Sequence, residues 1–453
     1  METIVNALAR FSAGLAHAAI PPAAADKAKV CILDLLGVAF AGAARSNAQV
    51  ALKTALRLGA PGKAAVWSST HSLRAVDAVL PNSVASHCIL QDDWLPLSHS
   101  HVGAAVVPTA LAIAAEEGSS GAEVIAAVVA AYDVADRAGH LSVPMFSRGF
   151  RASSLCAYFG AAAAAAKLMR LDPEQTANAL GFAGSVCGGV LQPWREGSME
   201  WSFQEGFAAR AGIMAAYLAQ DGLAGSRTVI EGASGVNASF AGTHDDERGA
   251  LDRLAEHFHI VDTCFKRFPT GGANQGSASV AHVLKRRHGI DWRRIEEVEV
   301  DIPKAGTHER MNYAGIDHAG AYRSFDQCLI SKQFAIAMNL KTGDMSYADM
   351  ERERENPGFL ELTRRIQLRE SDTLKGWDLR MRIHLDDGRC LEGTGADVDK
   401  DQLYLTWPAA VDKFRAVTRG LAAASRAESI VDAVSALDRM DSVLPLTALL
   451  NAA

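Results

Sequence analysis

The stretch FGAAAAAAKL, from Phe159 to Leu168, decides which class of fold this chain can adopt. Alanine has the highest helix propensity of all residues, and a helix covered by such small side chains can approach its neighbours closely. The run is too short to span a membrane, which takes about 20 apolar residues. We therefore predict a helix that lies inside a bundle of helices.

The helical pattern continues on both sides of this run, with apolar residues at three- and four-residue spacing up to about Phe265. Two helix starts are clearly marked, because Asp172 precedes Pro173 and Ser120 lies three positions before Glu123. We predict helices over residues 26–42, 102–117, 121–138, 153–169, 173–183 and 205–221.

The sequence pattern changes after Phe265. Residues 295–302 alternate like a half-buried strand, and residues 379–385 and 389–392 flank a turn with Gly388, as in a hairpin. Residues 363–369 are a third candidate strand. We predict a mostly α protein, with a large helical domain over 1–265, a smaller α+β domain over 266–400, and a helical return to the first domain over 401–453.

Composition excludes several classes of function. The formal net charge of −7 provides no basic surface for nucleic acid or an anionic membrane. The seven cysteines include no CxxC pair, which fits a reducing compartment and thiols that mostly lie in the core. The N-terminus lacks the basic region and the apolar run of a secretory signal. We expect a cytoplasmic protein.

The segment QDDWLPLSHSHVG, residues 91–103, contains the first candidate site. His99 and His101 are only two ligands, with no third His or Cys at a recognisable distance, so we expect no metal. A histidine next to a carboxylate, here Asp92 or Asp93, fits acid/base chemistry better, because its pKa lies near neutrality. The start of the following helix would also favour an anionic substrate.

A structural alternative exists for the same segment. Ser98 or Ser100 could cap the helix, with both histidines in solvent, and helix caps are far commoner than active sites. The sequence alone leaves both interpretations open.

Three further groups of residues could bind a carboxylate or could be structural. Lys266 and Arg267 lie where the composition changes, beside two glycines, and form either a carboxylate clamp or a solvated turn. The polar loop 192–206 contains Trp201, which either serves the site or seals the bundle. Arg151 could face the same anion, although Ser153 or Ser154 next to it could simply cap the alanine helix.

Several segments, in the same order along nearly the whole chain, resemble the MmgE/PrpD superfamily. They are residues 31–42, 101–108, 159–168, 171–181 and 265–269. The superfamily includes 2-methylcitrate dehydratase, cis-aconitate decarboxylase and iminodisuccinate epimerase. The resemblance implies a large helical domain, an α+β lid domain and a cleft at their junction. It also implies a homodimer and no metal or organic cofactor.

The resemblance breaks at several site positions. Trp94 stands where the superfamily has a threonine, and Trp201 stands where it has a lysine. Gln204, Arg151 and Gln275 each stand where it has a histidine. Amides cannot shuttle protons and arginine stays protonated, so several candidate proton donors are missing. The residues that match the superfamily pattern are His101, Lys266, Asp92 and Asp93.

The resemblance therefore implies an enzyme that removes a proton α to a carboxylate of a small di- or tricarboxylic acid. We expect His101 to be the base, oriented by Asp92 or Asp93, and Lys266 to stabilise the developing enediolate. The expected substrate-binding residues are Arg151, Arg267, Gln275, Trp94, Trp201, Gln204 and His99. A dehydratase-like lyase is the leading expectation. An epimerase and a non-catalytic carboxylate-binding relative are the alternatives.

Overall fold

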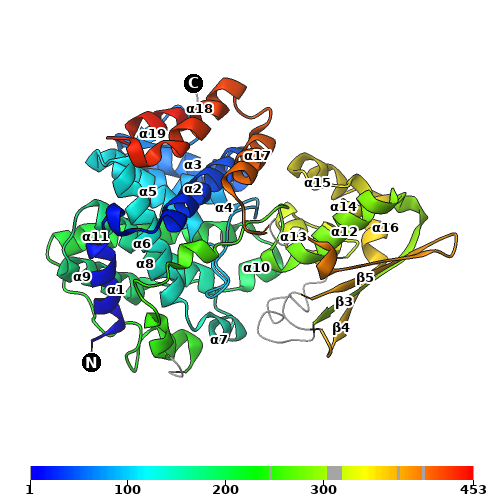
Figure 1. The fold of residues 1–453 in the computed structure, drawn as a ribbon, viewed down its shortest axis with the longest axis horizontal. Coiled ribbons are helices and arrows are strands. Elements are labelled where there is room, and N and C mark those ends of the chain that lie inside the picture. The colour runs from blue at the N-terminus through cyan, green and yellow to red at the C-terminus, as the bar shows by residue number, and fades with distance from the viewer. Residues whose placement is uncertain (1, 244–246, 304–318, 375–377, 400–402, 452–453) are drawn as a thin grey trace.

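The computed structural model describes residues 2–243, 247–303, 319–374, 378–399 and 403–451, which form two lobes (Figure 1). The larger lobe, at the left of the figure, combines helices from both ends of the chain. These are α1 (Ile4–Gly14), α2 (Pro22–Gly42), α3 (Ser46–Leu58), α4 (Ala75–His87), α5 (Gly103–Glu117), α6 (Gly121–Ala138), α7 (Ser142–Ser147), α8 (Ala152–Leu168), α9 (Pro173–Val186), α10 (Gln192–Glu196), α11 (Gln204–Gln220), α17 (Trp407–Thr418), α18 (Ala424–Ser435) and α19 (Leu444–Leu450).

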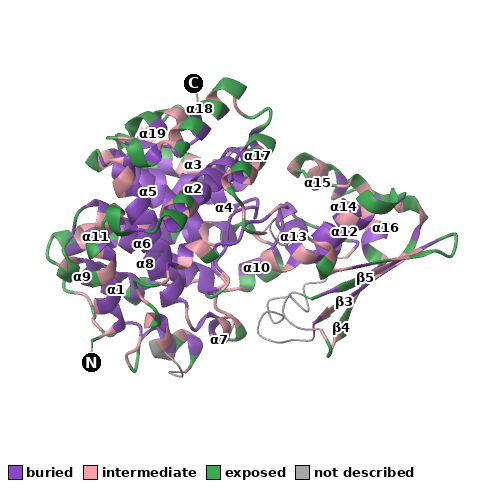
Figure 2. Cartoon of the chain, in the orientation of Figure 1, coloured by how far each residue is buried: buried purple, intermediate pink, exposed green. Residues whose placement is uncertain are grey.

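Helix α8 contains the alanine run and packs against α5, α6, α9 and α11. All six alanines from Ala161 to Ala166 are fully buried (Figure 2). A Cβ added at Gly212 of α11 would lie 2.5 Å from the Cβ of Ala161, and one added at Gly160 would lie 3.0 Å from the Cβ of Ala135 in α6. Larger side chains would push these helices apart. The predicted buried helix is confirmed.

The predicted helix over 121–138 is found as α6, and both predicted strong helix starts are confirmed. The Ser120 side chain accepts a hydrogen bond from the Glu123 amide, and Asp172 does the same for Gln175. In both, the third helical residue bonds back to the cap, which satisfies a second amide at the helix end.

The caps that the sequence left open as alternatives at Ser98 or Ser100 and at Ser153 or Ser154 are not found. Helix α5 follows Val102 and α8 follows Arg151, and neither helix has a side-chain cap. The Ser98 hydroxyl contacts that of Ser100 instead. The Ser153 hydroxyl donates to Glu205 Oε1 at 2.8 Å, so this serine belongs to a buried polar network.

The smaller lobe, at the right of Figure 1, is an α+β unit. Its sheet has the order β4-β3-β5-β6, in which β3 and β4 are parallel and the other pairs antiparallel. A Cβ added at Gly393 would lie 3.0 Å from Val280, so α12 packs closely on the sheet. The elements are α12 (Gln275–His288), β3 (Ile295–Pro303), α13 (Phe325–Ile330), α14 (Lys332–Thr342), α15 (Tyr347–Glu353), α16 (Pro357–Arg364), β4 (Ile366–Ser371), β5 (Arg380–Leu385) and β6 (Cys390–Thr394).

The strand predicted over 363–369 begins later than expected. Thr363 and Arg364 end α16, and β4 begins at Ile366, where pairing with Val298 of β3 starts. A short hairpin of β1 (Pro61–Ala65) and β2 (Ser72–Leu73) lies in the larger lobe. The predicted mostly α fold with a smaller α+β part is confirmed.

The buried apolar residues form two clusters. The first runs from Ile4 to Phe265 and includes the C-terminal helices, where Phe414 of α17 lies 3.0 Å from the Cβ position of Gly37 in α2. The second belongs to the smaller lobe and also includes Leu90, Trp194 and Trp201. These three residues from the larger lobe mark the junction between the lobes.

Two further features concern the described part of the chain. No helix there has the length and apolar character that crossing a membrane requires. The seven cysteines are free, and six of them are buried, as predicted for core thiols.

Candidate functional site

Two segments of the larger lobe meet next to the second apolar cluster. The loop between α4 and α5 carries Asp92, Asp93 and His101, and the segment after residue 262 carries Lys266. Trp94 in the loop and Cys264 in the segment exchange two backbone hydrogen bonds of 2.9 Å in an antiparallel bridge. Residues far apart in the sequence are thereby held side by side.

Asp92 is the centre of a buried charged cluster. Its Oδ1 accepts a hydrogen bond from Lys266 Nζ at 2.9 Å, and its Oδ2 lies 2.6 Å from His87 Nδ1. All three side chains are fully buried. Burial alone would raise the pKa of Asp92, but His87 and Lys266 outweigh it and hold that pKa well below its usual value. Asp92 is therefore a carboxylate at neutral pH.

His101 lies at the edge of this cluster, with 14% of its side chain exposed. Its Nδ1 donates to the Asp93 carbonyl at 2.8 Å and lies 3.2 Å from Lys266 Nζ. Burial and the nearby lysine lower the pKa of His101 well below its usual value. Because the carbonyl can only accept, we assign the proton to Nδ1, which leaves the Nε2 lone pair of a neutral imidazole available.

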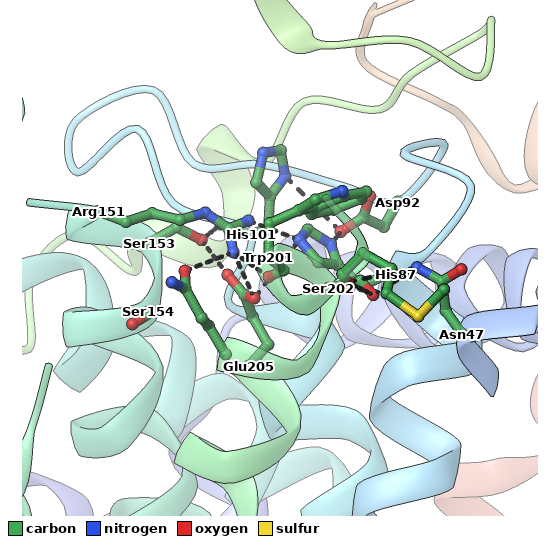
Figure 3. A network of polar contacts seen from close by, with 12 residues as sticks. Asn47, His87, Asp92, His101, Arg151, Ser153, Ser154, Trp201, Ser202 and Glu205 are labelled. Atoms are coloured by element: carbon green, nitrogen blue, oxygen red, sulfur yellow. Dashed lines mark hydrogen bonds and ion pairs between the residues drawn. The ribbon is translucent and has the colours of Figure 1, made fainter. Parts of the chain in front are cut away.

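A second network extends the cluster through Arg151. This arginine donates to His87 Nε2 at 2.6 Å and to Glu205 Oε2 at 2.9 Å (Figure 3). It also donates to the Trp201 carbonyl at 2.6 Å and to Gln204 Oε1 at 3.0 Å. A guanidinium only donates, so His87 accepts at Nε2 and donates from Nδ1 to the carboxylate beyond it. Glu205 therefore compensates the charge of Arg151 within the protein.

Aromatic rings connect this network to the smaller lobe. The ring of Trp201 lies 5.0 Å from that of His87 and 5.1 Å from that of Trp194, in edge-to-face contacts. Its indole nitrogen donates to Asp326 Oδ1 of α13 at 2.8 Å. Asn47 reaches the same carboxylate oxygen at 3.4 Å. Trp201 therefore contacts both the cluster and the smaller lobe.

The remaining predicted binding residues lie in other surroundings. Gln275 bonds through both amide atoms to the backbone of residues 267–270, so it supports the loop that follows Lys266. Arg267 contacts His282 Nε2 at 3.0 Å and lies over the Phe268 ring. His99 contacts Ser142 at 3.1 Å. These contacts lie outside the Asp92 cluster, and the role of the three side chains in substrate binding remains a prediction.

Sequence reasoning missed several residues of this network, including His87, Glu205 and Asp326. His87 ends a helix whose sequence is mostly apolar. Glu205 lies in the first turn of a helix, where acidic residues are common. The only signal for His87 was its place five residues before Asp92. For the two acids the sequence carried none, because their partners come from distant segments.

The cluster does not have the composition of a metal site. Among the residues that the structure describes, no group of three or more His, Cys, Asp or Glu side chains could hold a metal ion. Each carboxylate near His101 is bound to a cation or a hydroxyl of the protein.

Asp93 has a different environment from Asp92. Its Oδ2 accepts a hydrogen bond from Tyr132 at 2.5 Å, and its Oδ1 lies 2.4 Å from the Cβ position of Gly103, so only glycine fits there. Burial raises the pKa of Asp93 to about 7, assisted by Asp92 and opposed by the Tyr132 hydrogen bond. The protonated acid is therefore favoured in the folded protein below about pH 7.

We predict that Asp93→Asn changes how stability depends on pH. The folded pKa lies above the unfolded value near 4, so the stabilising contribution of protonated Asp93 is lost as the pH rises from about 4 to 7. The amide does not titrate, so the variant should gain about 2–4 kcal/mol relative to the wild type across this range. Urea unfolding at pH 4, 5, 6, 7 and 8 measures this difference. A difference that stays constant would contradict the prediction.

Two segments of the chain match known protein domains. Residues 6–248 match the MmgE/PrpD N-terminal domain and residues 268–439 match the MmgE/PrpD C-terminal domain. The chain belongs to the MmgE/PrpD family. Lys266 lies between the two matched segments, just before the loop that Gln275 supports.

Cis-aconitate decarboxylases from several organisms are similar to this chain over most of its length. Cis-aconitate decarboxylase from Aspergillus terreus is 23% identical over 481 aligned positions, which cover 99% of this chain and 96% of the relative. The cis-aconitate decarboxylase of Homo sapiens is 25% identical, covering 100% and 95%. That of Mus musculus is 25% identical, covering 94% and 88%. The family resemblance expected from the sequence is confirmed.

Proposed function

We propose that this protein is a lyase that transfers a proton at the carbon next to a carboxylate of a small di- or tricarboxylic acid, without a cofactor. The observation that carries the proposal is the neutral, partly exposed imidazole of His101 beside the buried Lys266–Asp92 ion pair. The cis-aconitate decarboxylases similar to this chain support the substrate class and the lyase type.

In the proposed mechanism His101 is the base. Its Nε2 takes the proton, while the hydrogen bond from Nδ1 to the Asp93 carbonyl keeps the ring oriented. Asp92 Oδ2, at 3.7 Å from Nδ1, stabilises the imidazolium that forms. The ammonium of Lys266 stabilises the negative charge that develops on the substrate carboxylate. For epimerisation, the imidazolium of His101 returns its proton to the carbon. For loss of water, Lys266 Nζ donates a proton to the departing hydroxyl group.

A second candidate function is epimerisation. His87, Arg151 and Glu205 are buried and bonded to one another, which leaves His101 as the partly exposed base of the cluster. Epimerisation needs only removal and return of one proton, so a site with few mobile proton donors suits it. Loss of carbon dioxide or water requires, in addition, stabilisation of the departing group.

Proton NMR in deuterium oxide tests the proposal. The purified protein is incubated with cis-aconitate, 2-methylcitrate, citrate and substituted succinates, and the spectra are followed for deuterium incorporation and for new products. Lyase activity gives a product with one carbon dioxide or water fewer, and an epimerase gives deuterium at the stereocentre. Calorimetric binding without exchange or conversion of any acid would contradict the proposal and indicate a non-catalytic relative.

We also predict that Trp94 restricts the choice of substrate. Its indole is 95% buried, and its ring lies 3.9 Å from the Cβ position of Gly272 in the turn after Lys266. Trp94→Thr removes the bulk of this ring, so kcat/KM should improve for larger tricarboxylates relative to dicarboxylates, by roughly 10-fold. Competition between two acids in one NMR sample measures the ratio directly. An unchanged ratio, in a variant with wild-type melting temperature, would refute this role.

A further inference from the structure

The last turn of α6 contacts both segments that carry the proposed catalytic residues. Asp136 is buried, and its two oxygens bind different segments. Its Oδ1 accepts a hydrogen bond from the Ser98 amide at 3.0 Å, and its Oδ2 lies 2.8 Å from His259 Nδ1. Ser98 is three residues before His101, so one carboxylate connects the loop between α4 and α5 to the segment that leads to Lys266.

Two neighbouring residues of α6 add further contacts to the second segment. Asp133 Oδ2 accepts the His259 amide at 3.0 Å, and its Oδ1 accepts Arg137 Nε at 3.0 Å. Arg137 in turn donates to the carbonyls of Asp252 at 2.8 Å and His257 at 3.1 Å. These side chains are almost fully buried, so the polar groups that they bind cannot exchange them for water without cost.

The contacts of α6 and the bridge between Trp94 and Cys264 form a closed frame. One side of the frame is residues 94–98 and the other is residues 259–264, joined at one end by the backbone bridge and at the other by Asp136. Lys266 lies two residues beyond the end with the backbone bridge, and His101 lies three residues beyond the end with Asp136. A second bridge, between Leu95 and Ser100, turns the loop back, so that His101 Nδ1 lies 3.2 Å from Lys266 Nζ. A change of 1 Å in such a spacing is enough to cost about 100-fold in rate.

We propose that Asp136 and His259 are positioning residues that set the spacing between His101 and Lys266. This inference rests on the proposed function, because it assigns the spacing a role in proton transfer. Neither residue touches the substrate. Together they keep the His101 loop in register with the Lys266 segment.

Two substitutions at His259 separate positioning from general stability. His259→Ala removes the bond to Asp136, whereas His259→Asn places an amide nitrogen near the position of Nδ1 and can donate to the same oxygen. We expect kcat to fall roughly 10- to 100-fold in His259→Ala with KM within about 3-fold of the wild type, and to be mostly retained in His259→Asn. Asp136→Asn, which keeps an acceptor for the Ser98 amide, should loosen only the second segment.

Two measurements on the protein without substrate test the positioning role separately from the proposed reaction. Ring nitrogen NMR signals report the protonation pattern of His101, and amide hydrogen exchange reports the order of residues 94–103 and 257–266. His259→Ala should change the His101 signals and speed exchange in both segments, and His259→Asn should not. If these changes occur while wild-type protein converts no acid, the positioning holds and the proposed reaction is wrong. If His259→Ala lowers only the melting temperature, the positioning role is refuted.

Discussion

Replacing His101 by alanine is expected to lower kcat by roughly 100- to 10,000-fold, the usual contribution of a general base. The reason is that the neutral imidazole combines an available Nε2 with an Nδ1 fixed on the Asp93 carbonyl. Among the described ionisable groups of the cluster, His87, Arg151 and Glu205 are bonded to each other and cannot replace it. Steady-state kinetics with the best acid from the NMR panel measure the loss.

A matched pair of variants makes this result specific. His101→Asn keeps a donor to the Asp93 carbonyl but has no basic nitrogen, so it should be as inactive as His101→Ala. His288→Ala removes an exposed histidine at the end of α12 and should leave kcat unchanged. If His101→Asn keeps more than about a tenth of the activity, His101 orients the substrate and another group is the base.

Replacing Asp92 by asparagine is expected to destabilise the protein by about 3–5 kcal/mol, the usual cost of removing one partner from a buried ion pair. The substitution leaves Lys266 fully buried without its carboxylate and alters the partner of His87. Chemical denaturation at pH 7 measures this difference.

The dependence of stability on pH provides a second test of the role of Asp92. The folded pKa of Asp92 lies below the unfolded value near 4, so its stabilisation is present above that pH and is lost as the pH falls further.

The ion pair also predicts a particular pattern of coupling. Lys266→Met in the Asp92→Asn background removes the uncompensated cation, so the double variant should be more stable than Asp92→Asn alone. Glu428→Gln is the control, because its pair with Arg415 is about half exposed and should contribute less than about 1 kcal/mol. Additive losses for the two buried substitutions would show that the pair is not coupled, and would contradict the electrostatic account of this cluster.

Much of the fold could be predicted because local signals and burial agree along the chain. The alanine run, the caps at Ser120 and Asp172, and the alternation in residues 295–302 all describe structure that is set within a few residues. The alternative caps at Ser98 and Ser153 do not form, because tertiary partners compete for the same hydroxyls. A hydroxyl near a helix start satisfies the cap rule by sequence alone, but its buried neighbours decide where it bonds.

Some residues of the candidate site could likewise be predicted from the sequence, and others could not. Periodicity and short motifs were enough to predict the helical class of the fold, the family, and Asp92, His101 and Lys266 as candidate site residues. Contacts between distant segments, in contrast, place Arg151 between His87 and Glu205, bond Trp201 to Asp326, and make Gln275 support a loop. The physical reason is that a pKa, a tautomer or an ion pair depends on distances of 3 to 4 Å between segments, and no local pattern encodes those distances.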